Sequence, residues 1–590
     1  MRNFNYDIIQ DPVKEYESRY RDEFSNKAAA LFEDIVNKSG VSEEANEKLV
    51  NEINHLQEVY NNSYANSGSW GMLYLFLIIV LIIGIIMSAI LVAKSNGVSI
   101  YIWLTVAWVL GGFFWFKGTK YTAIRIDFWE QECSKTKSLR DAKNKEAWDM
   151  MLPLNRQFQW ENINNLITQT LPIFEIDRFL SQARLNQLLK EYDFDEFGND
   201  CSVKCCQSGS LNGNPWVLFD VTSQDWEDVT YEGSKTISYL SYETYTDSKG
   251  STRFRFVTKK QTLYATHTEK APRYTRKKVL VYGLKDDVEK LSFSRVPVNV
   301  AGDSIKEDEK KKELLKLSRD FIITVMSNDT FEASFYAIDR TDEADFRKVF
   351  DASAQAAIYN LLKDKKVGYG DDFSFKKKGK INILISEHMN KTNISCNPKK
   401  FHHFNLKKAR DNFMHDCEDY FRSFFFTFAP LFCSDVYQNH TWLEDTSPTD
   451  IDKSIASTYE CEALAYYMGE NTFAPKNAQT QILLKAKIED VNDKTASVNI
   501  TADAFTVNKR CIYVPKWGND LVRHKVPVYY DEYIPVSKDT QIKVINPETE
   551  DSIAFDDLTK TKEWSDYIEL IGADSKTQVY RRGLAAFKSK

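Results

Sequence analysis

Few segments of this 590-residue chain combine the residue types that metal binding requires. The segment from Asp193 to Gly198 begins like a calcium-binding loop. Phe197 and Lys204 stand where two of the oxygen ligands are needed, so a solvated turn is the better prediction. Three nearby cysteines lack the CxxC spacing of a zinc site, namely Cys201, Cys205 and Cys206.

The densest cluster of imidazole and thiol groups contains His402, His403, His415 and Cys417. His415 and Cys417 are two residues apart and would point to different faces of a helix, so packing or capping is favoured over metal binding. A Cys–His nucleophile pair stays open as an alternative, because its two partners need only meet in space.

The chain has none of the common phosphate-binding, dinucleotide-binding, zinc-protease or serine-hydrolase motifs. We therefore predict no catalytic residue, no cofactor and no metal ion. The sequence leans towards a protein without enzymatic activity. An active site assembled from scattered residues is the alternative.

Basic residues gather in two places. The first group falls within nine residues and contains Lys270, Arg273, Arg276, Lys277 and Lys278. The second contains Lys399, Lys400, His402, His403, Lys407, Lys408 and Arg410. Near an anionic bilayer each such residue contributes about 1 kcal/mol. We predict that the first group faces lipid head groups, with solvated surface or a lysine-protected β-edge as the alternative.

A phenylalanine-rich segment from Phe421 to Phe432 is too short to span a membrane. We predict that it belongs to the protein core. An interfacial helix or a groove for a partner is the alternative.

Two uncharged apolar runs are long enough to form membrane-spanning helices, which would anchor the rest of the chain. Gly71 to Ala93 has 23 residues, which as a helix would cover about 35 Å and exceed the hydrocarbon core of a bilayer. Val98 to Phe116 adds a second run of 19 residues after a four-residue connection. Because neither run contains a charged residue, we predict a transmembrane helical hairpin that serves as an anchor.

The distribution of charge predicts the orientation. Positive residues follow the second run at Lys117, Lys120, Arg125, Lys135 and Lys137, whereas the connection has Lys94 alone. Positive flanks favour the cytoplasmic side, so we predict a cell-membrane protein with two passes, whose termini and large domain are cytoplasmic. Nine cysteines without a disulfide pattern fit a reducing compartment. The net charge of -7 opposes nucleic-acid binding.

The periodicity of apolar residues predicts an α+β chain. N-terminal helices, the two-helix transmembrane hairpin and a helical stalk would precede a mixed α+β soluble body with several antiparallel β-hairpins. Thr236 to Thr258 predicts one such hairpin, and Phe331 to Ile338 predicts a strand. The predicted parts are 1–68 (N-terminal helices), 69–118 (transmembrane hairpin), 119–200 (helical stalk), 201–300 (mainly β), 301–450 (α+β) and 451–590 (β-rich).

The order of these parts resembles the bacterial membrane-anchored family of unknown function DUF 3137. The residues that carry the resemblance are Asn328-Asp329-Thr330-Phe331-Glu332, Phe335, Ile358, Leu361-Leu362, Phe373-Ser374-Phe375 and Ile381-Asn382-Ile383. It covers residues 60–390, and residues 400–590 look additional. The resemblance implies a bacterial protein with a cytoplasmic α+β domain and a LemA-like membrane protein as a partner, and it implies no site residue.

Three functions fit these observations. The first is a binding or scaffold component held at the cytoplasmic face of the membrane. The second is a subunit of an oligomeric membrane complex, and the third is an enzyme with a non-motif active site. The predicted partners are the lipid bilayer, anionic lipid head groups, and a membrane protein or a second copy of the chain.

Overall fold

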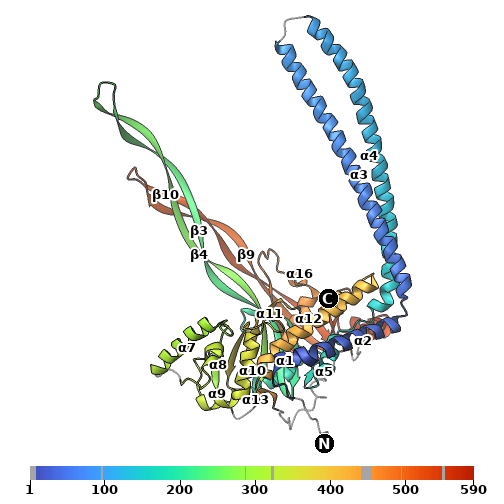
Figure 1. Ribbon diagram of the computed structural model, residues 1–590, viewed down its shortest axis with the longest axis vertical. Coiled ribbons are helices and arrows are strands. Elements are labelled where there is room, and N and C mark those ends of the chain that lie inside the picture. The colour runs from blue at the N-terminus through green and yellow to red at the C-terminus, as the bar shows by residue number, and fades with distance from the viewer. Residues whose placement is uncertain are drawn as a thin grey trace. The chain divides into compact units, whose positions relative to one another are not determined.

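The computed structural model describes residues 8–94, 98–285, 288–320, 324–439, 455–492, 495–547 and 552–589. Helices and antiparallel sheets are both present, so the predicted α+β class is confirmed (Figure 1). The chain divides into two compact units. Unit 1 contains Met1–Ala29, Gln159–Asn397 and Asp416–Lys590, and unit 2 contains Ala30–Phe158 and Pro398–His415. Each unit thus joins segments that are far apart in the sequence.

Unit 1 is built on two antiparallel sheets. The seven-stranded sheet has the order β1-β2-β3-β4-β7-β6-β5, and the five-stranded sheet has the order β11-β12-β10-β9-β8. The first contains β1 (Phe174–Ile176), β2 (Cys201–Leu211), β3 (Asn214–Thr246), β4 (Thr252–Gly283), β5 (Ser292–Arg295), β6 (Phe373–Lys378) and β7 (Ile381–Ser386). The second contains β8 (Leu483–Asn492), β9 (Thr495–Trp517), β10 (Arg523–Ile545), β11 (Val579–Arg581) and β12 (Leu584–Lys588).

Two hairpins extend as long two-stranded ribbons (Figure 1). β3 pairs with β4 from Trp216↔Tyr282 to Thr246↔Thr252, although β2 pairs only with the part of β3 that ends at Ser223. At about 3.3 Å per residue, β3 covers on the order of 110 Å. The predicted hairpin at 236–258 is confirmed as the end of this ribbon.

The β3–β4 ribbon packs on the β9–β10 ribbon by one face. Ile237, Leu263, Ala265, Val526 and Val528 form a buried cluster between them. A Cβ atom added to Gly233 would lie 2.1 Å from the carbonyl oxygen of Pro527, so only glycine allows the two backbones to approach this closely.

Helices cover the sheets of unit 1. They are α1 (Pro12–Glu15), α5 (Asn162–Thr170), α6 (Gln182–Glu191), α7 (Ser304–Arg319), α8 (Asp329–Phe335), α9 (Glu343–Val349), α10 (Ala352–Lys363), α11 (Glu387–Lys391), α13 (Asp435–Gln438), α15 (Thr458–Met468), α16 (Glu470–Phe473), α17 (Ser552–Leu558) and α18 (Lys562–Leu570). A π-helical turn at Tyr16–Tyr20 follows α1, and 3-10 turns lie at Pro398–Phe401 in unit 2 and Ser575–Thr577. α2 (Arg21–Ser39) and α12 (Leu406–Phe432) each supply residues to both units.

Two predicted elements differ from the structure. The strand predicted at 331–338 is wrong, because Asn328 caps the helix α8 by accepting from the Phe331 amide at 3.1 Å. Tyr336 then ends the helix at φ +54°. The helical stalk predicted at 119–200 is too long, since α4 (Val98–Asn155) ends two residues after Pro153. The strand β1 lies within the remainder of that range.

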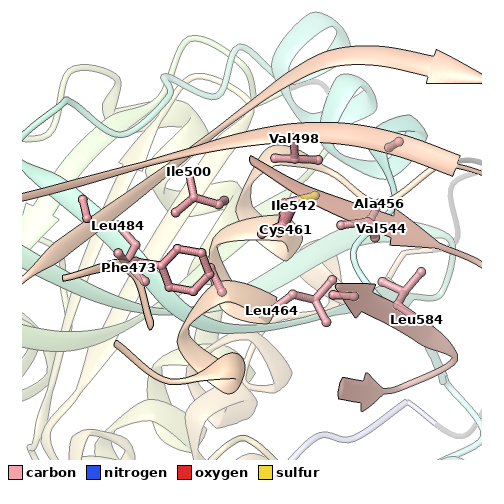
Figure 2. Packing of buried hydrophobic residues seen from close by; sticks show 14 of the residues in the cluster. Ala456, Cys461, Leu464, Phe473, Leu484, Val498, Ile500, Ile542, Val544 and Leu584 are labelled. Atoms are coloured by element: carbon pink, nitrogen blue, oxygen red, sulfur yellow. The ribbon is translucent and has the colours of Figure 1, made fainter. Parts of the chain in front are cut away.

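The core beneath the five-stranded sheet joins its strands to α15 (Figure 2). Val498 and Ile500 of β9 and Ile542 of β10 face Cys461 and Leu464 of α15, and all five are buried. Phe473, Leu484, Val544 and Leu584 extend the same cluster. This packing fixes the base of the β9–β10 ribbon.

The phenylalanine-rich segment lies in the core, as predicted. It forms the second half of α12, where Phe424 and Phe428 have ring centroids 5.7 and 5.2 Å from Trp216 of β3. Phe174 of β1 lies 5.2 Å from Phe424 and 4.9 Å from Phe428. The stacked pair Phe24–Phe421, at 4.0 Å, adds the N-terminal part of α2 to this core.

The two sheets are joined by a buried carboxylate at the start of α15. Ser457 caps this helix by accepting from the Glu460 amide, and the Glu460 side chain is completely buried. Its carboxylate accepts from Arg581 of β11, from Cys206 Sγ of β2 at 3.1 Å and from the Leu180 amide at 3.1 Å. One group therefore satisfies donors from both sheets.

Glu460→Ala should reduce the free energy of unfolding by about 3–5 kcal/mol, because it leaves the Arg581 guanidinium buried without its ion-pair partner. Denaturant unfolding of the full chain in mild detergent measures this loss. The matched control is Glu470→Ala, which breaks the partly exposed Lys204–Glu470 pair (2.8 Å) and should cost less than about 1 kcal/mol. Equal effects of the two substitutions would contradict the role assigned to Glu460.

Candidate membrane-contact site

α3 (Glu43–Lys94) presents a long apolar surface that no other described residue covers. Its large apolar side chains from Met72 to Leu91 are mostly exposed; Met72 is 70% exposed, and Ile82, Ile83, Ile85 and Ile86 are about half exposed. By length and composition, the Glu43–Leu91 part is the one helix among the described residues that could cross a membrane, and none of its most apolar window is buried. Of the two predicted spans, this supports the first.

α4 lies antiparallel to α3 in unit 2 (Figure 1). Trp108 Nε1 donates to Ser88 Oγ at 2.9 Å, and Trp115 Nε1 donates to the Leu77 carbonyl at 2.8 Å. The second apolar run forms the start of α4, but the side chains of 98–101 and 103 lie outside the described residues. A second membrane span therefore stays a prediction.

A groove of about 270 Å³ lies between these two helices. Small residues at Gly84, Ser88, Gly111 and Gly112 make room for it, and Trp108 lies against Gly84. The sequence analysis did not predict the hydrogen bond between Trp108 and Ser88. An antiparallel alignment of the two helices would have indicated this bond. In such an alignment the residue numbers of contacting positions add to nearly the same value, as they do for 88 with 108 and for 77 with 115.

Both helices continue in contact beyond the apolar runs. Trp70 and Tyr121 meet at a ring distance of 5.7 Å. Further along, Arg140 donates to Gln57 at 2.9 Å, and Lys143 pairs with Glu52 at 3.2 Å. The change from apolar to charged contacts marks the end of the surface suited to lipid.

The five basic residues predicted to face lipid all lie on β4 but do not form one patch. Alternate residues of a strand point to opposite faces, so Lys270, Arg276 and Lys278 share one face and Arg273 and Lys277 share the other. Arg273 is exposed and pairs with Glu227 at 3.2 Å. Lys270 and Lys277 are exposed.

Two of these residues hold the sheet together. Lys278 is buried, and its Nζ donates to the Asn390 carbonyl at 2.9 Å. Burial lowers the pKa of Lys278. Arg276 makes a bidentate contact with Asp220 at 2.7 and 2.6 Å, and these hydrogen bonds raise its pKa. The expectation that all five form a single lipid-facing group is therefore corrected.

The second basic group is also engaged with the protein. Arg410 pairs with Glu33 at 2.8 Å and lies 3.8 Å from Glu43. The His403 ring nitrogen Nδ1 accepts from the Asn405 amide at 2.9 Å. Burial lowers the pKa of both His402 and His403, which favours their neutral forms.

The groups suited to metal or thiol chemistry have structural partners. Among the described residues, no group of three or more His, Cys, Asp or Glu side chains could hold a metal ion. Burial raises the pKa of the Cys206 thiol well above its usual value, so this cysteine stays protonated and is a poor nucleophile. Its neighbour Cys205 is in contact with Arg581 at 3.2 Å.

One cluster has the outline of a catalytic triad. His388 Nδ1 lies 2.5 Å from Asp372, and its Nε2 lies 3.2 Å from Thr427 Oγ1. The Thr427 hydroxyl, however, donates to the Ser423 carbonyl at 2.8 Å, and Thr427 is 1% exposed. Because the hydroxyl proton is directed away from His388 and the group is buried, the arrangement supports the packing of α12 and does not activate a nucleophile.

Comparison with known protein families, with curated proteins and with solved structures finds no match to this chain. The resemblance to DUF 3137 and the LemA-like partner therefore stay predictions.

Glu462 of α15 is a buried carboxyl group whose pKa is raised towards neutral pH. Burial raises its pKa to about 7, although Lys485 at 3.5 Å and the amides of Val203 and Ala486 oppose the shift. Its two oxygens face these amides from β2 and β8. Both are occupied by the fold, so we assign Glu462 a structural role.

This raised pKa predicts how stability depends on pH. The folded state binds a proton that the unfolded state releases above its ordinary pKa of about 4.3, so the contribution of Glu462 is complete below that pH and is lost as the pH rises through about 7. The wild type should therefore lose about 2–3 kcal/mol of its free energy of unfolding between pH 5 and pH 8 through this group. The Glu462→Gln variant has no proton to release there, so its free energy of unfolding minus that of the wild type should rise by the same amount. Denaturant unfolding at both pH values measures the difference. The control Glu489→Gln alters an exposed carboxyl and should give the same difference at both.

Proposed function

We propose that this chain is a membrane-anchored binding or scaffold protein whose folded body lies at the cytoplasmic face of a bacterial membrane. The observation that carries the proposal is the exposed apolar surface of α3 from Met72 to Leu91. In water this surface would be far larger than the apolar patches that monomeric proteins expose. A bilayer covers it at no cost in hydrogen bonds, because the helix satisfies its own backbone.

The helix α4 would supply the second pass of the anchor. Its pairing with α3 through Trp108–Ser88 and Trp115–Leu77 satisfies two indole N–H groups that lipid could not. The lysines that follow at Lys117 and Lys120 would then lie at the cytoplasmic interface. The body of unit 1 contributes large sheets and helices without a motif for chemistry, which supports binding over catalysis.

A subunit of an oligomeric membrane complex is the second candidate. The groove between α3 and α4 favours it, since a Cβ added at Gly111 or Gly112 would meet no atom within 4 Å. Small residues at such a groove allow another helix to approach closely. Size measurement in detergent by light scattering separates a monomer from a complex.

Charged residues in the apolar surface of α3 should abolish anchoring. Ile79→Glu, Ile83→Glu and Ile86→Glu together should move the protein from the carbonate-resistant membrane fraction to the soluble or aggregated fraction, because an acidic residue at the centre of a span costs about 3 kcal/mol. Fractionation followed by immunoblotting measures the shift. The control Asn61→Glu with Asn62→Glu lies on exposed positions of the same helix before the apolar run and should remain in the membrane. Retention of the triple variant in the membrane would contradict the anchor.

Cysteine labelling tests the orientation. Cys511 on β9 is exposed, so an impermeant maleimide should label it in lysed cells and not in intact cells. In a Cys511→Ser background, Ser95→Cys places a thiol in the predicted external turn and should be labelled in intact cells. Labelling of Cys511 from outside would contradict the proposed topology.

A further inference from the structure

The end of the β3–β4 ribbon, residues 240–260, stands free of the rest of unit 1. We name it the ribbon tip. The contacts that the β9–β10 turn makes on this ribbon lie just before it, where Asn519 donates to Gln261 and to Tyr239. No residue of the ribbon tip is buried. Figure 1 shows the β3–β4 ribbon continuing past the end of the β9–β10 ribbon.

The ribbon tip carries four large apolar side chains on one face, whereas Tyr245 lies on the other. Tyr242 is opposite Phe256, and the next positions on this face pair Leu240 with Thr258 and Thr244 with Phe254. Leu240, Tyr242, Phe254 and Phe256 are 74%, 68%, 70% and 82% exposed. The rings of Tyr242 and Phe254 are in contact at 6.1 Å, which confirms that they share the face.

The ribbon tip is also basic, although the whole chain has a net charge of -7. Between residues 240 and 260 there are five cations (Lys249, Arg253, Arg255, Lys259 and Lys260) and two acids (Glu243 and Asp247), a local net charge of +3. Both acids are already paired, Asp247 with Arg253 at 2.7 Å and Glu243 with Lys259 at 3.3 Å. Most of the cations lie on the face opposite to the apolar one.

We propose that the ribbon tip binds the surface of an anionic lipid bilayer, with Leu240, Tyr242, Phe254 and Phe256 inserted among the head groups. An apolar face backed by Lys and Arg is the pattern of elements that lie in a membrane interface. Tyrosine suits this position because its ring is apolar and its hydroxyl remains hydrated. This contact is separate from the anchor at α3 and goes beyond it.

Two arguments favour lipid over a second copy of the chain. The four side chains offer roughly 600 Å², less than the ~800 Å² that each partner contributes to a stable protein interface. Two copies would also bring two tips of net charge +3 together, whereas anionic head groups attract them. A two-stranded ribbon is only marginally stable by itself, so a surface that covers one face would also order it.

Site-specific fluorescence in the full chain tests the proposal. Thr244→Cys in a Cys511→Ser background places an environment-sensitive dye on the apolar face without removing any of its four side chains. The signal of the Cys511→Ser parent, which retains partly exposed Cys133 and Cys201, is subtracted. The protein is reconstituted into phosphatidylcholine vesicles with or without phosphatidylserine. Lipid that is spin-labelled at the head group is placed either in these vesicles or in a second, protein-free population.

The expected result is a blue shift and quenching that depend on phosphatidylserine. Serine at Leu240, Tyr242, Phe254 and Phe256 should abolish both signals. Lys249→Gln with Lys260→Gln should lower the equilibrium constant for the contact by roughly fivefold for each cation. Quenching from either vesicle population supports the proposal, and the population that quenches tells whether the tip binds its own membrane or a facing one.

Matched controls lie on the same face of the ribbon. A dye at Thr266→Cys is about 40 Å from position 244 along the strands and should not be quenched. Tyr264→Ser removes an aromatic side chain that is 70% exposed but lies outside the tip, and it should leave the Thr244→Cys signal unchanged.

Two outcomes would overturn the proposal. One is that the dye at position 244 is not quenched although the protein floats together with the vesicles in a density gradient. This result would refute the tip contact and leave the α3 anchor intact. The other is a blue shift that rises with protein density and not with phosphatidylserine, which would assign the face to a second copy of the chain. If the protein fails to reconstitute but added anionic vesicles still quench the dye, the anchor is wrong and the tip contact stands.

Discussion

The arrangement of unit 1 depends on the buried carboxylates of α15. Glu460 takes donors from β2 and β11, and Glu462 takes backbone amides from β2 and β8, so one helix turn is bonded to both sheets. A carboxylate without these donors could not remain buried, and Arg581 without Glu460 could not either. The two sheets therefore hold one relative position, and the bases of both ribbons are fixed with them.

The bonds of Glu460 and Glu462 to the two sheets determine which face of the β3–β4 ribbon is not covered by the β9–β10 ribbon. A shift of one residue in a strand exchanges its two faces, so the register at Trp216↔Tyr282 decides the direction of every side chain as far as Thr246. With this register, Gly233 and Ile237 meet the β9–β10 ribbon at Pro527 and Val528. Towards the end of the ribbon, the even-numbered positions, which include Tyr242 and Phe256, are left on the uncovered face.

Much of the fold could be predicted because its elements have strong local signals. The uncharged run from Gly71 to Ala93 predicts a long apolar helix, the Phe421–Phe432 segment predicts core, and Asp247–Gly250 predicts the turn of a hairpin. Local signals fail where a short segment is ambiguous. Phe331 to Ile338 alternates like a strand, but the Asn328 cap and the packing of Phe331 and Phe335 make it a helix.

The surroundings of the five basic residues near Lys270 were harder to predict, because adjacency in sequence is a poor guide to adjacency on a strand. The five basic residues near Lys270 are close in sequence and still divide between two faces, and Asp220, which binds Arg276 and lies near Lys278, is more than fifty residues away. Neither Asp220 nor Asn390 could be assigned without the pairing of β3 with β4 and the position of α11. The same alternation places Phe254 and Phe256 on one face, and Tyr242 joins them in the register that pairs Thr246 with Thr252.

The chain therefore presents two kinds of apolar surface with different physical demands. The surface of α3 has no charged residue between Gly71 and Ala93 and suits the hydrocarbon core, where a helix satisfies its own backbone. The ribbon tip has unpaired strand edges and cations on its other face, so it can enter only the hydrated head-group layer. The different suitability of the helix and of the ribbon follows from one rule, that every backbone polar group must keep a partner.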